Sequence, residues 1–220
     1  MNLSSSEENY IKTIYHLQAH GETVTTNALA QQLVAKPASI TDMLKKLKAK
    51  KLVHYQPYRG FRLNNEGTKA ALGIIRRHRL WEFFLAEKLK FDWDEVHAIA
   101  EELEHVSSRK LVDKLDAFLG YPKFDPHGDP IPDINGRMEN NQQVSLADLP
   151  LHKVATVCQV SNQSRGMLEL LRHKHIAIGT KLEVKKKFSF DQSIDVKIRQ
   201  QAPVNISGEL AKNIFVKYDA

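Results

Sequence analysis

The order of secondary structure encoded at the start of this 220-residue chain constrains its fold most strongly. Apolar residues at helical spacing predict a first helix over residues 3–20, and the Thr25-Thr26 pair opens a second, short helix. Pro37 is a favoured first residue of a helix, because its missing N–H has no partner to lose there, so we expect a third helix over residues 37–50. Residues 52–63 contain two short apolar runs around a loop with proline and glycine, and they predict a β-hairpin. This order of elements indicates a winged helix-turn-helix.

In such a fold the second helix of the helix-turn-helix enters the major groove, and its first residues meet base edges. Here those residues have short side chains, and lysines behind them are placed to neutralise phosphates. We therefore expect part of the readout to come from methyl contacts and DNA shape. The alternative is a winged helix that binds protein through a lysine-rich face. The predicted DNA-binding residues are Thr26, Lys36, Pro37, Ala38, Ser39, Thr41, Lys45, Lys46 and Arg59.

Charge is segregated along the chain. Residues 1–80 contain 13 Lys or Arg and 5 Asp or Glu, residues 81–160 contain 8 and 15, and residues 161–220 contain 11 and 6. A basic start next to an acidic middle indicates one surface that meets a polyanion and another that collects cations. Ordinary solvated charge is the alternative interpretation.

The acidic middle contains a candidate metal-binding face. On a helix through residues 93–106, the side chains of His97, Glu101, Glu104 and His105 fall within an arc of about 100°. Carboxylates this close repel one another and raise their own pKa values unless a cation lies between them. The alternative is a solvent-facing charged helix with incidental histidines.

The preceding helix adds His78 and Glu82, which are four residues apart and share a face. Imidazole and carboxylate ligands without thiolates suit divalent cations such as Mn(II), Fe(II) or Co(II). Metal binding would then draw these helices and the N-terminal helix into one arrangement. Ligands on facing helices also occur in di-metal oxidases, so a carboxylate–histidine metalloenzyme is a rival interpretation.

The remainder of the chain divides into helices, a turn-rich segment and strands. Residues 65–89 and 92–119 predict two long helices, and residues 120–150 read as a linker. No apolar run approaches the roughly 18 residues of a membrane span, and the single cysteine excludes an internal disulfide framework. We therefore expect a cytoplasmic protein without a membrane partner. A small β-barrel with one short helix at residues 167–171 is predicted from strands at residues 154–160, 181–186, 194–198 and 214–218.

These features together resemble the metal-dependent repressors typified by the diphtheria toxin repressor and the manganese transport regulators. The similarity covers almost the whole chain. It is carried by Glu8-Asn9-Tyr10-Ile11 with Ile14-Tyr15, the helix at residues 37–50, Tyr58-Arg59-Gly60-Phe61-Arg62-Leu63, Arg77-His78-Arg79-Leu80-Trp81-Glu82, Glu101-Glu102-Leu103-Glu104-His105-Val106 and Asp125-Pro126-His127-Gly128-Asp129-Pro130-Ile131-Pro132.

The resemblance implies a mainly α-helical chain with a small β domain. Its expected parts are a winged helix-turn-helix DNA-binding domain (residues 1–72), a helical metal-binding and dimerisation domain (73–138), a linker (139–152) and a C-terminal SH3-like, FeoA-like β-barrel (153–220).

The resemblance also implies a primary, activating metal site at Glu101, Glu104 and His105, helped by Asn9. Position 101 is Glu, as in the manganese-responsive members, where the iron-responsive branch has Cys. An oxygen and imidazole site favours Mn(II). Position 9 is Asn, where manganese members have Asp and iron members Met, so either metal affinity is lower or Glu8 contributes.

A companion site is implied at His78, Glu82 and His97, with further ligands from the linker or the C-terminal domain. Members with a Cys-Pro-His-Gly linker use its Cys and His as ligands. This chain keeps His127 and has Asp125 in place of the Cys. Aspartate still ligates a hard cation.

The resulting hypothesis is a homodimeric, metal-activated transcriptional repressor, not an enzyme, that binds palindromic operator DNA and controls metal uptake and homeostasis genes. Mn(II) is the expected ion, Fe(II) the second choice, and Co(II) or Zn(II) substitutes in vitro. The main rival is a winged-helix regulator that senses an organic ligand. Unchanged DNA binding after chelation would favour that rival.

Overall fold

The computed structural model describes residues 3–19, 21, 23–57, 60–106, 108–139, 142–198 and 202–218. Two compact units make up the chain. The first comprises residues 1–78, 102–109 and 132–137, and the second comprises residues 79–101, 110–131 and 138–220.

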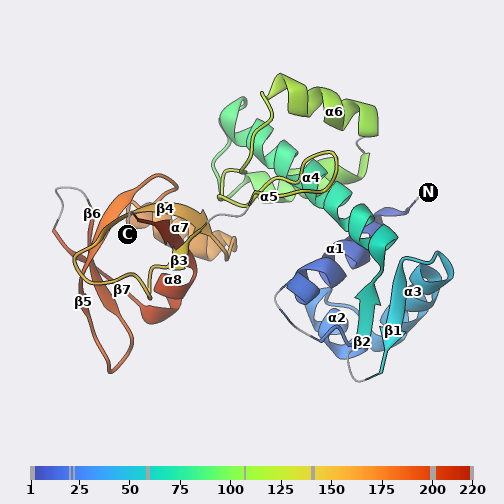
Figure 1. The fold of residues 1–220 in the computed structure, drawn as a ribbon, viewed down its shortest axis with the longest axis horizontal. Helices are drawn as coiled ribbons and strands as arrows, with labels where there is room; N and C mark the ends of the chain where they lie inside the picture. Colours follow the sequence, from blue (N-terminus) through green and yellow to red (C-terminus); the bar gives the residue numbers. More distant parts are fainter. Residues whose placement is uncertain are drawn as a thin grey trace. The chain divides into compact units, whose positions relative to one another are not determined.

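Three helices and a hairpin open the first unit, in the predicted order (Figure 1). The start of the second helix is set by Thr25, whose hydroxyl accepts a hydrogen bond from the Ala28 amide at 3.1 Å. The third helix begins with Pro37, as predicted. The elements are α1 (Ser5–Ala19), α2 (Thr26–Gln32), α3 (Pro37–Ala49), β1 (Val53–Gln56) and β2 (Gly60–Leu63).

The core of this unit is built from one apolar face of each helix. Ile40, Leu44 and Leu47 of α3 are buried at helical spacing, and they pack in one cluster with Ile11 of α1 and Leu29 of α2. Burial of this face leaves the opposite face of α3 in solvent, which is the geometry that a DNA-reading helix needs.

The hairpin is held against the rest of the first unit at Gly60. This residue has a φ of +67°, and the Phe61 amide next to it donates to the Val24 carbonyl at 2.9 Å. A Cβ at position 60 would lie 2.3 Å from that carbonyl oxygen. Only glycine fits this close approach without moving the backbone.

The helical region that follows contains three helices where the sequence predicts two. These are α4 (Asn65–Glu87), α5 (Val96–Val106) and α6 (Arg109–Phe118). The expectation for residues 65–89 is confirmed, but a single helix over residues 92–119 is wrong. Ser108 directly precedes α6, and serine favours the N-terminal cap of a new helix, an interruption that apolar spacing does not register.

A six-stranded antiparallel sheet fills the C-terminal part of the second unit. Its strand order is β3-β8-β4-β5-β6-β7. Register shifts in β4 and β5 mark bulges, which bend strands. Its strands and the two accompanying helices are β3 (Val144–Ser145), β4 (Val154–Val160), α7 (Arg165–His173), β5 (Lys181–Lys187), β6 (Ile194–Ile198), β7 (Val204–Ile206), α8 (Gly208–Lys212) and β8 (Ile214–Lys217).

The sequence predicts four of these strands and α7, but not β3, β7 or α8, which are short. β3 lies inside residues 139–152, where the sequence predicts a linker. Leu146 and Leu149, just after it, are fully buried in the core of the sheet. The apolar residues of this stretch, Val144, Leu146, Leu149 and Leu151, are irregularly spaced and carry too little periodicity to reveal this packing. Among the described helices, none combines the length and the apolar character that a membrane crossing requires.

Candidate DNA-binding surface and metal centres

The predicted DNA-binding residues of α3 lie on its exposed face. Thr41 donates its hydroxyl hydrogen to the Pro37 carbonyl at 3.0 Å, and Lys45 forms a 3.3 Å ion pair with Asp42. Thr26, the first residue of α2, is half-buried, and Arg59 lies outside the described residues. The exposed residues are Lys36, Pro37, Ala38, Ser39, Thr41, Lys45 and Lys46.

Three groups of side chains in the described part of the chain place potential ligand atoms within 4.8 Å of one another. Every predicted metal ligand except Asn9 belongs to one of them. The groups are His78, His97 and Glu101; Glu101, Glu104 and His105; and Glu82, Asp125 and His127.

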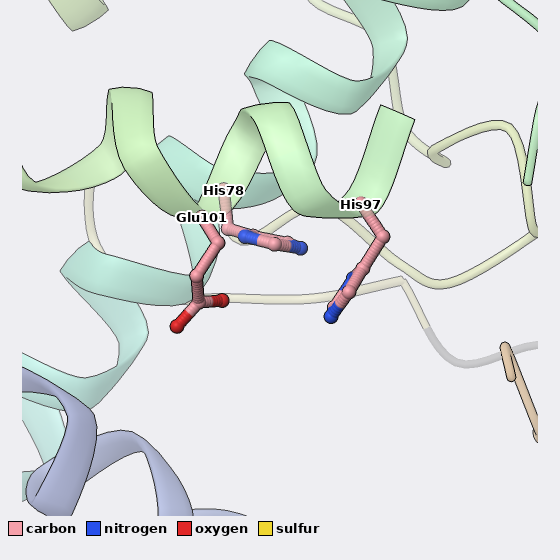
Figure 2. A group of neighbouring side chains, drawn as sticks. All are labelled: His78, His97 and Glu101. Atoms are coloured by element: carbon pink, nitrogen blue, oxygen red, sulfur yellow. The ribbon is translucent and has the colours of Figure 1, made fainter. Parts of the chain in front are cut away.

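Figure 2 shows the first group, in which the imidazoles of His78 and His97 and the carboxylate of Glu101 extend to the same side of their helices. The companion ligands predicted from the sequence are thus distributed over two groups, because Glu82 lies with Asp125 and His127. Glu82 still contacts His97, since its Oε1 is 3.1 Å from His97 Nδ1.

Glu104 is the fully buried carboxylate of the second group. Its Oε2 accepts a hydrogen bond from His78 Nδ1 and its Oε1 accepts one from Lys12 Nζ, each at 2.7 Å. Burial raises the pKa of Glu104, but the hydrogen bond from His78 and the charge of Lys12 outweigh burial and hold the pKa below its usual range. The side chain is therefore an ionised carboxylate, the form that ligates a cation.

His105 is oriented by Glu8 of α1. Glu8 Oε2 is 2.7 Å from His105 Nδ1, and because a carboxylate accepts, Nδ1 carries the proton. In a neutral imidazole the lone pair is then on Nε2. His105 Nε2 is buried, has no hydrogen-bond partner, and lies 3.5 Å from Glu104 Oε1. A histidine whose second ring nitrogen donates to a carboxylate is the usual arrangement of a metal ligand.

The third group is the most buried. Glu82, Asp125 and His127 are at most 5% exposed. His127 Nε2 is 2.8 Å from the Trp93 carbonyl, which can only accept, so Nδ1 has the lone pair; it is buried without a hydrogen-bond partner, 3.9 Å from Glu82 Oε2. Asp125 Oδ2 is likewise buried and without a hydrogen-bond partner. Buried ligand atoms without hydrogen-bond partners, in a group whose potential ligand atoms lie within 4.8 Å of one another, fit a bound cation.

Electrostatics in the third group also favour a cation. Burial raises the pKa of Asp125 well above its usual range, and the nearby charges of Asp129 and Glu82 raise it further. The Arg79 guanidinium, 3.7 Å from Asp125 and 3.3 Å from Asp129, opposes this only in part. A divalent ion would neutralise the excess negative charge.

The loop that carries Asp125 and His127 is fixed by backbone contacts. Asp125 Oδ1 accepts from the amides of His127 and Asp129 at 2.8 and 2.9 Å. Gly128 has a φ of +86°, and a Cβ there would lie 1.9 Å from the Cys158 carbonyl oxygen. The adjacent His127 carbonyl accepts from the Val160 amide of β4.

Sequence reasoning missed several side chains around these groups. Lys12 and Arg77 are cations beside the carboxylates of Glu104 and Glu8. Trp93 supplies the carbonyl that fixes His127. The spacing Glu8 to Lys12, one turn of α1, is the signal that could have placed both side chains on one face.

Comparison with known families assigns most of the chain. Residues 2–61 match the family described as iron dependent repressor, N-terminal DNA binding domain. Residues 64–133 match iron dependent repressor, metal binding and dimerisation domain. Residues 144–218 match the FeoA domain.

Individual proteins agree with this assignment. Iron-dependent repressor IdeR of Mycobacterium leprae is 29% identical over 156 residues, 68% of this chain and 68% of that protein. The diphtheria toxin repressor of Corynebacterium glutamicum is 25% identical over 193 residues, 83% of this chain and 85% of that protein. A solved manganese-dependent transcriptional repressor in complex with manganese is 32% identical with a TM-score of 0.86, and the match covers 96% of this chain and 99% of that one. The chain has a winged helix-turn-helix, a helical dimerisation domain and a C-terminal FeoA domain, which is SH3-like. It therefore belongs to the family of iron-dependent repressors that includes the diphtheria toxin repressor, and it is a metal-dependent DNA-binding transcriptional repressor.

Proposed function

We propose that this repressor is activated by Mn(II), with Fe(II) as the second physiological ion and Co(II) or Zn(II) as substitutes in vitro. The donor set supports this choice, because the three ligand groups contain only carboxylates and imidazoles. Such ligands give no advantage to the softer, thiolate-preferring ions. The observation that carries the proposal is the unpartnered His105 Nε2, which faces the ionised Glu104 next to Glu101.

In this proposal Glu101, Glu104 and His105 form the primary, activating site. Asn9 adds an amide oxygen, because its Oδ1 is buried without a hydrogen-bond partner. Asn9 lies three residues before Lys12 on α1, so the two side chains share a face. Lys12 contacts Glu104 from that face.

Glu82, Asp125 and His127 form the companion site, with His78 and His97 as neighbouring ligands. When bound, the ion supplies positive charge between carboxylates that otherwise repel. The chain's own residues orient the ligands: Trp93 fixes the tautomer of His127, and the loop amides hold Asp125 in place.

For DNA binding, the proposed form is a homodimer that reads a palindromic operator. Its proposed domains are residues 1–72, 73–138 and 153–220, and the segment 139–152 between the last two contributes β3 to the C-terminal sheet. A two-fold axis would relate two α3 helices, so half-sites are expected about 34 Å, or a small multiple of this, apart. Metal binding shifts the equilibrium towards the DNA-binding conformation. The size of this shift is limited by the ratio of the metal affinities of the DNA-binding and inactive conformations.

The proposal is tested by titrating Mn(II) into the protein with a fluorescent duplex, selected from random DNA in the presence of Mn(II), and measuring anisotropy. We expect the wild type to bind only with metal, and Glu104→Ala/His105→Ala to lose the response. The control Glu102→Ala changes an exposed residue of the same helix and should respond normally. A double variant that still responds to Mn(II) would contradict the proposed ligands.

Repeating the titration with Fe(II), Co(II) and Zn(II) tests the choice of ion. We expect half-maximal operator binding at free Mn(II) concentrations within those that cells maintain. A response to Zn(II) alone would exclude manganese as the activating ion.

A further inference from the structure

A lysine ammonium contacts one member of the primary ligand group. Lys12, on α1, reaches Glu104 of α5 with its Nζ 2.7 Å from Glu104 Oε1. The Lys12 side chain is 14% exposed and the Glu104 side chain 0%. An ion pair this buried is not an ordinary surface contact, because both partners lose most of their hydration.

The ammonium of Lys12 lies where it would meet a metal ion bound by Glu104 and His105. Lys12 bonds the same carboxylate oxygen, Oε1, that lies 3.5 Å from the unpartnered His105 Nε2. The other oxygen of Glu104 is bonded to His78. A divalent ion held jointly by Glu104 and His105 would have to approach the oxygen that Lys12 contacts.

We propose that Lys12 is a built-in competitor of the activating ion, a tethered cation that pairs with Glu104 in the metal-free protein and raises the metal concentration needed for activation. The inference rests on the proposed function, because it assumes that Glu104 and His105 ligate the ion. It assigns to Lys12 a role in setting the affinity of the site, not in ligation.

Two physical effects give Lys12 this role. A positive charge within a few ångströms of a divalent cation repels it, and partial burial strengthens that repulsion relative to water. The ammonium also stabilises the metal-free state, because it neutralises a buried carboxylate near Glu101 that would otherwise repel its neighbour. Metal binding therefore has to break or share the Lys12–Glu104 hydrogen bond.

The test is Lys12→Met, which keeps the apolar stem of the side chain and removes the charge. A matched control is Lys50→Met, which removes the lysine paired at 2.7 Å with Glu7 of α1, a carboxylate that belongs to none of the three ligand groups. Isothermal titration of metal-free protein with Mn(II) alone should show binding about tenfold tighter for Lys12→Met. Binding to Lys50→Met should be unchanged.

Thermal unfolding gives a second measure that needs no DNA. In EDTA, Lys12→Met should melt at a lower temperature than the wild type, since Glu104 loses one of its two hydrogen-bond partners, and Mn(II) should raise its melting temperature by more. Lys12→Arg keeps the charge and should bind Mn(II) as the wild type does. Should Lys12→Met fail to fold, Lys12→Gln provides a neutral side chain that can still donate to Glu104.

The outcomes separate this inference from the proposed function. Equal or weaker Mn(II) binding by the neutral variants, with loss of one of the two Mn(II) sites in Glu104→Ala/His105→Ala, would overturn the role of Lys12 and leave the ligand set intact. Undiminished Mn(II) binding by the double variant would overturn the ligand set itself.

Discussion

At the scale of single residues, the unpaired ring nitrogens carry most of the functional information. His105 and His127 each have one ring nitrogen fixed by an acceptor and the other buried without a hydrogen-bond partner. Desolvation of an imidazole nitrogen without a partner is unfavourable, so such atoms indicate a ligand that completes the site. Glu8 matters for the same reason, because it holds His105 in the tautomer that a metal requires.

Glu8→Gln tests this orienting role. The substitution keeps the size of the side chain but removes the charge that stabilises the Nδ1–H of His105 and that pairs with Arg77 at 2.6 Å. We expect Mn(II) affinity to fall by about tenfold or more, as for other residues that orient metal-bound histidines. Calorimetric titration checks this, with Glu102→Gln on the exposed face of α5 as the control. An unchanged affinity would mean that His105 is oriented by other contacts.

At the scale of elements, α3 presents the candidate DNA-binding residues and α5 carries most of the candidate ligands of the primary metal site. The apolar face of α3 is buried, so its short polar residues are presented to solvent. The helix α5 carries His97, Glu101, Glu104 and His105 within three turns. The wing makes a close backbone contact at Gly60 with the segment before α2.

Gly60→Ala tests the attachment of the wing. The Cβ would meet the Val24 carbonyl and would also disfavour the φ of +67°, so the free energy of unfolding should fall by about 2 kcal/mol or more. Gly73→Ala is the matched control, because nothing lies within 4 Å of its Cβ in α4. It should raise stability by about 0.5–1 kcal/mol. Denaturant titration of metal-free protein measures both, and equal effects would contradict the close approach at Gly60.

At the scale of the whole molecule, metal binding and DNA binding are thermodynamically linked. A metal that increases operator affinity by some factor must itself bind more tightly, by the same factor, when operator is present. This reciprocity holds for any structural route between the ligand groups and α3. Measuring both factors therefore tests whether metal binding and operator binding are coupled in this protein.

The two factors are measured by titrating Mn(II) into protein with and without a saturating operator duplex, and by titrating the duplex with and without Mn(II). We expect both factors to be equal and to lie near 5–150, the usual range for coupled sites. In Glu104→Ala/His105→Ala both should fall to about one. Tighter DNA binding in Mn(II) without tighter Mn(II) binding on DNA would point to metal acting on the DNA.

The fold was largely predictable where local patterns dominate. Helical spacing, Pro37 and the hairpin loop were enough for α1–α3 and the wing, since each burial pattern is encoded within a few adjacent residues. The break between α5 and α6 and the short strands β3 and β7 were not predicted. A serine before a new helix leaves no periodicity, and strands of two or three residues are stabilised by partners distant in the chain.

The residues of the candidate metal sites likewise divide into those that local sequence patterns predict and those that only the folded structure brings together. Sequence by itself determined that His97, Glu101, Glu104 and His105 share a helix face, because 3.6 residues per turn fixes that outcome before any packing occurs. Only the tertiary structure decided that Glu82 groups with Asp125 and His127, that Glu8 orients His105, and that Lys12 reaches Glu104. These contacts join residues that are 43 to 97 positions apart in the sequence. Local helix and strand propensities cannot predict such contacts, because only the packing of the folded core brings these residues together.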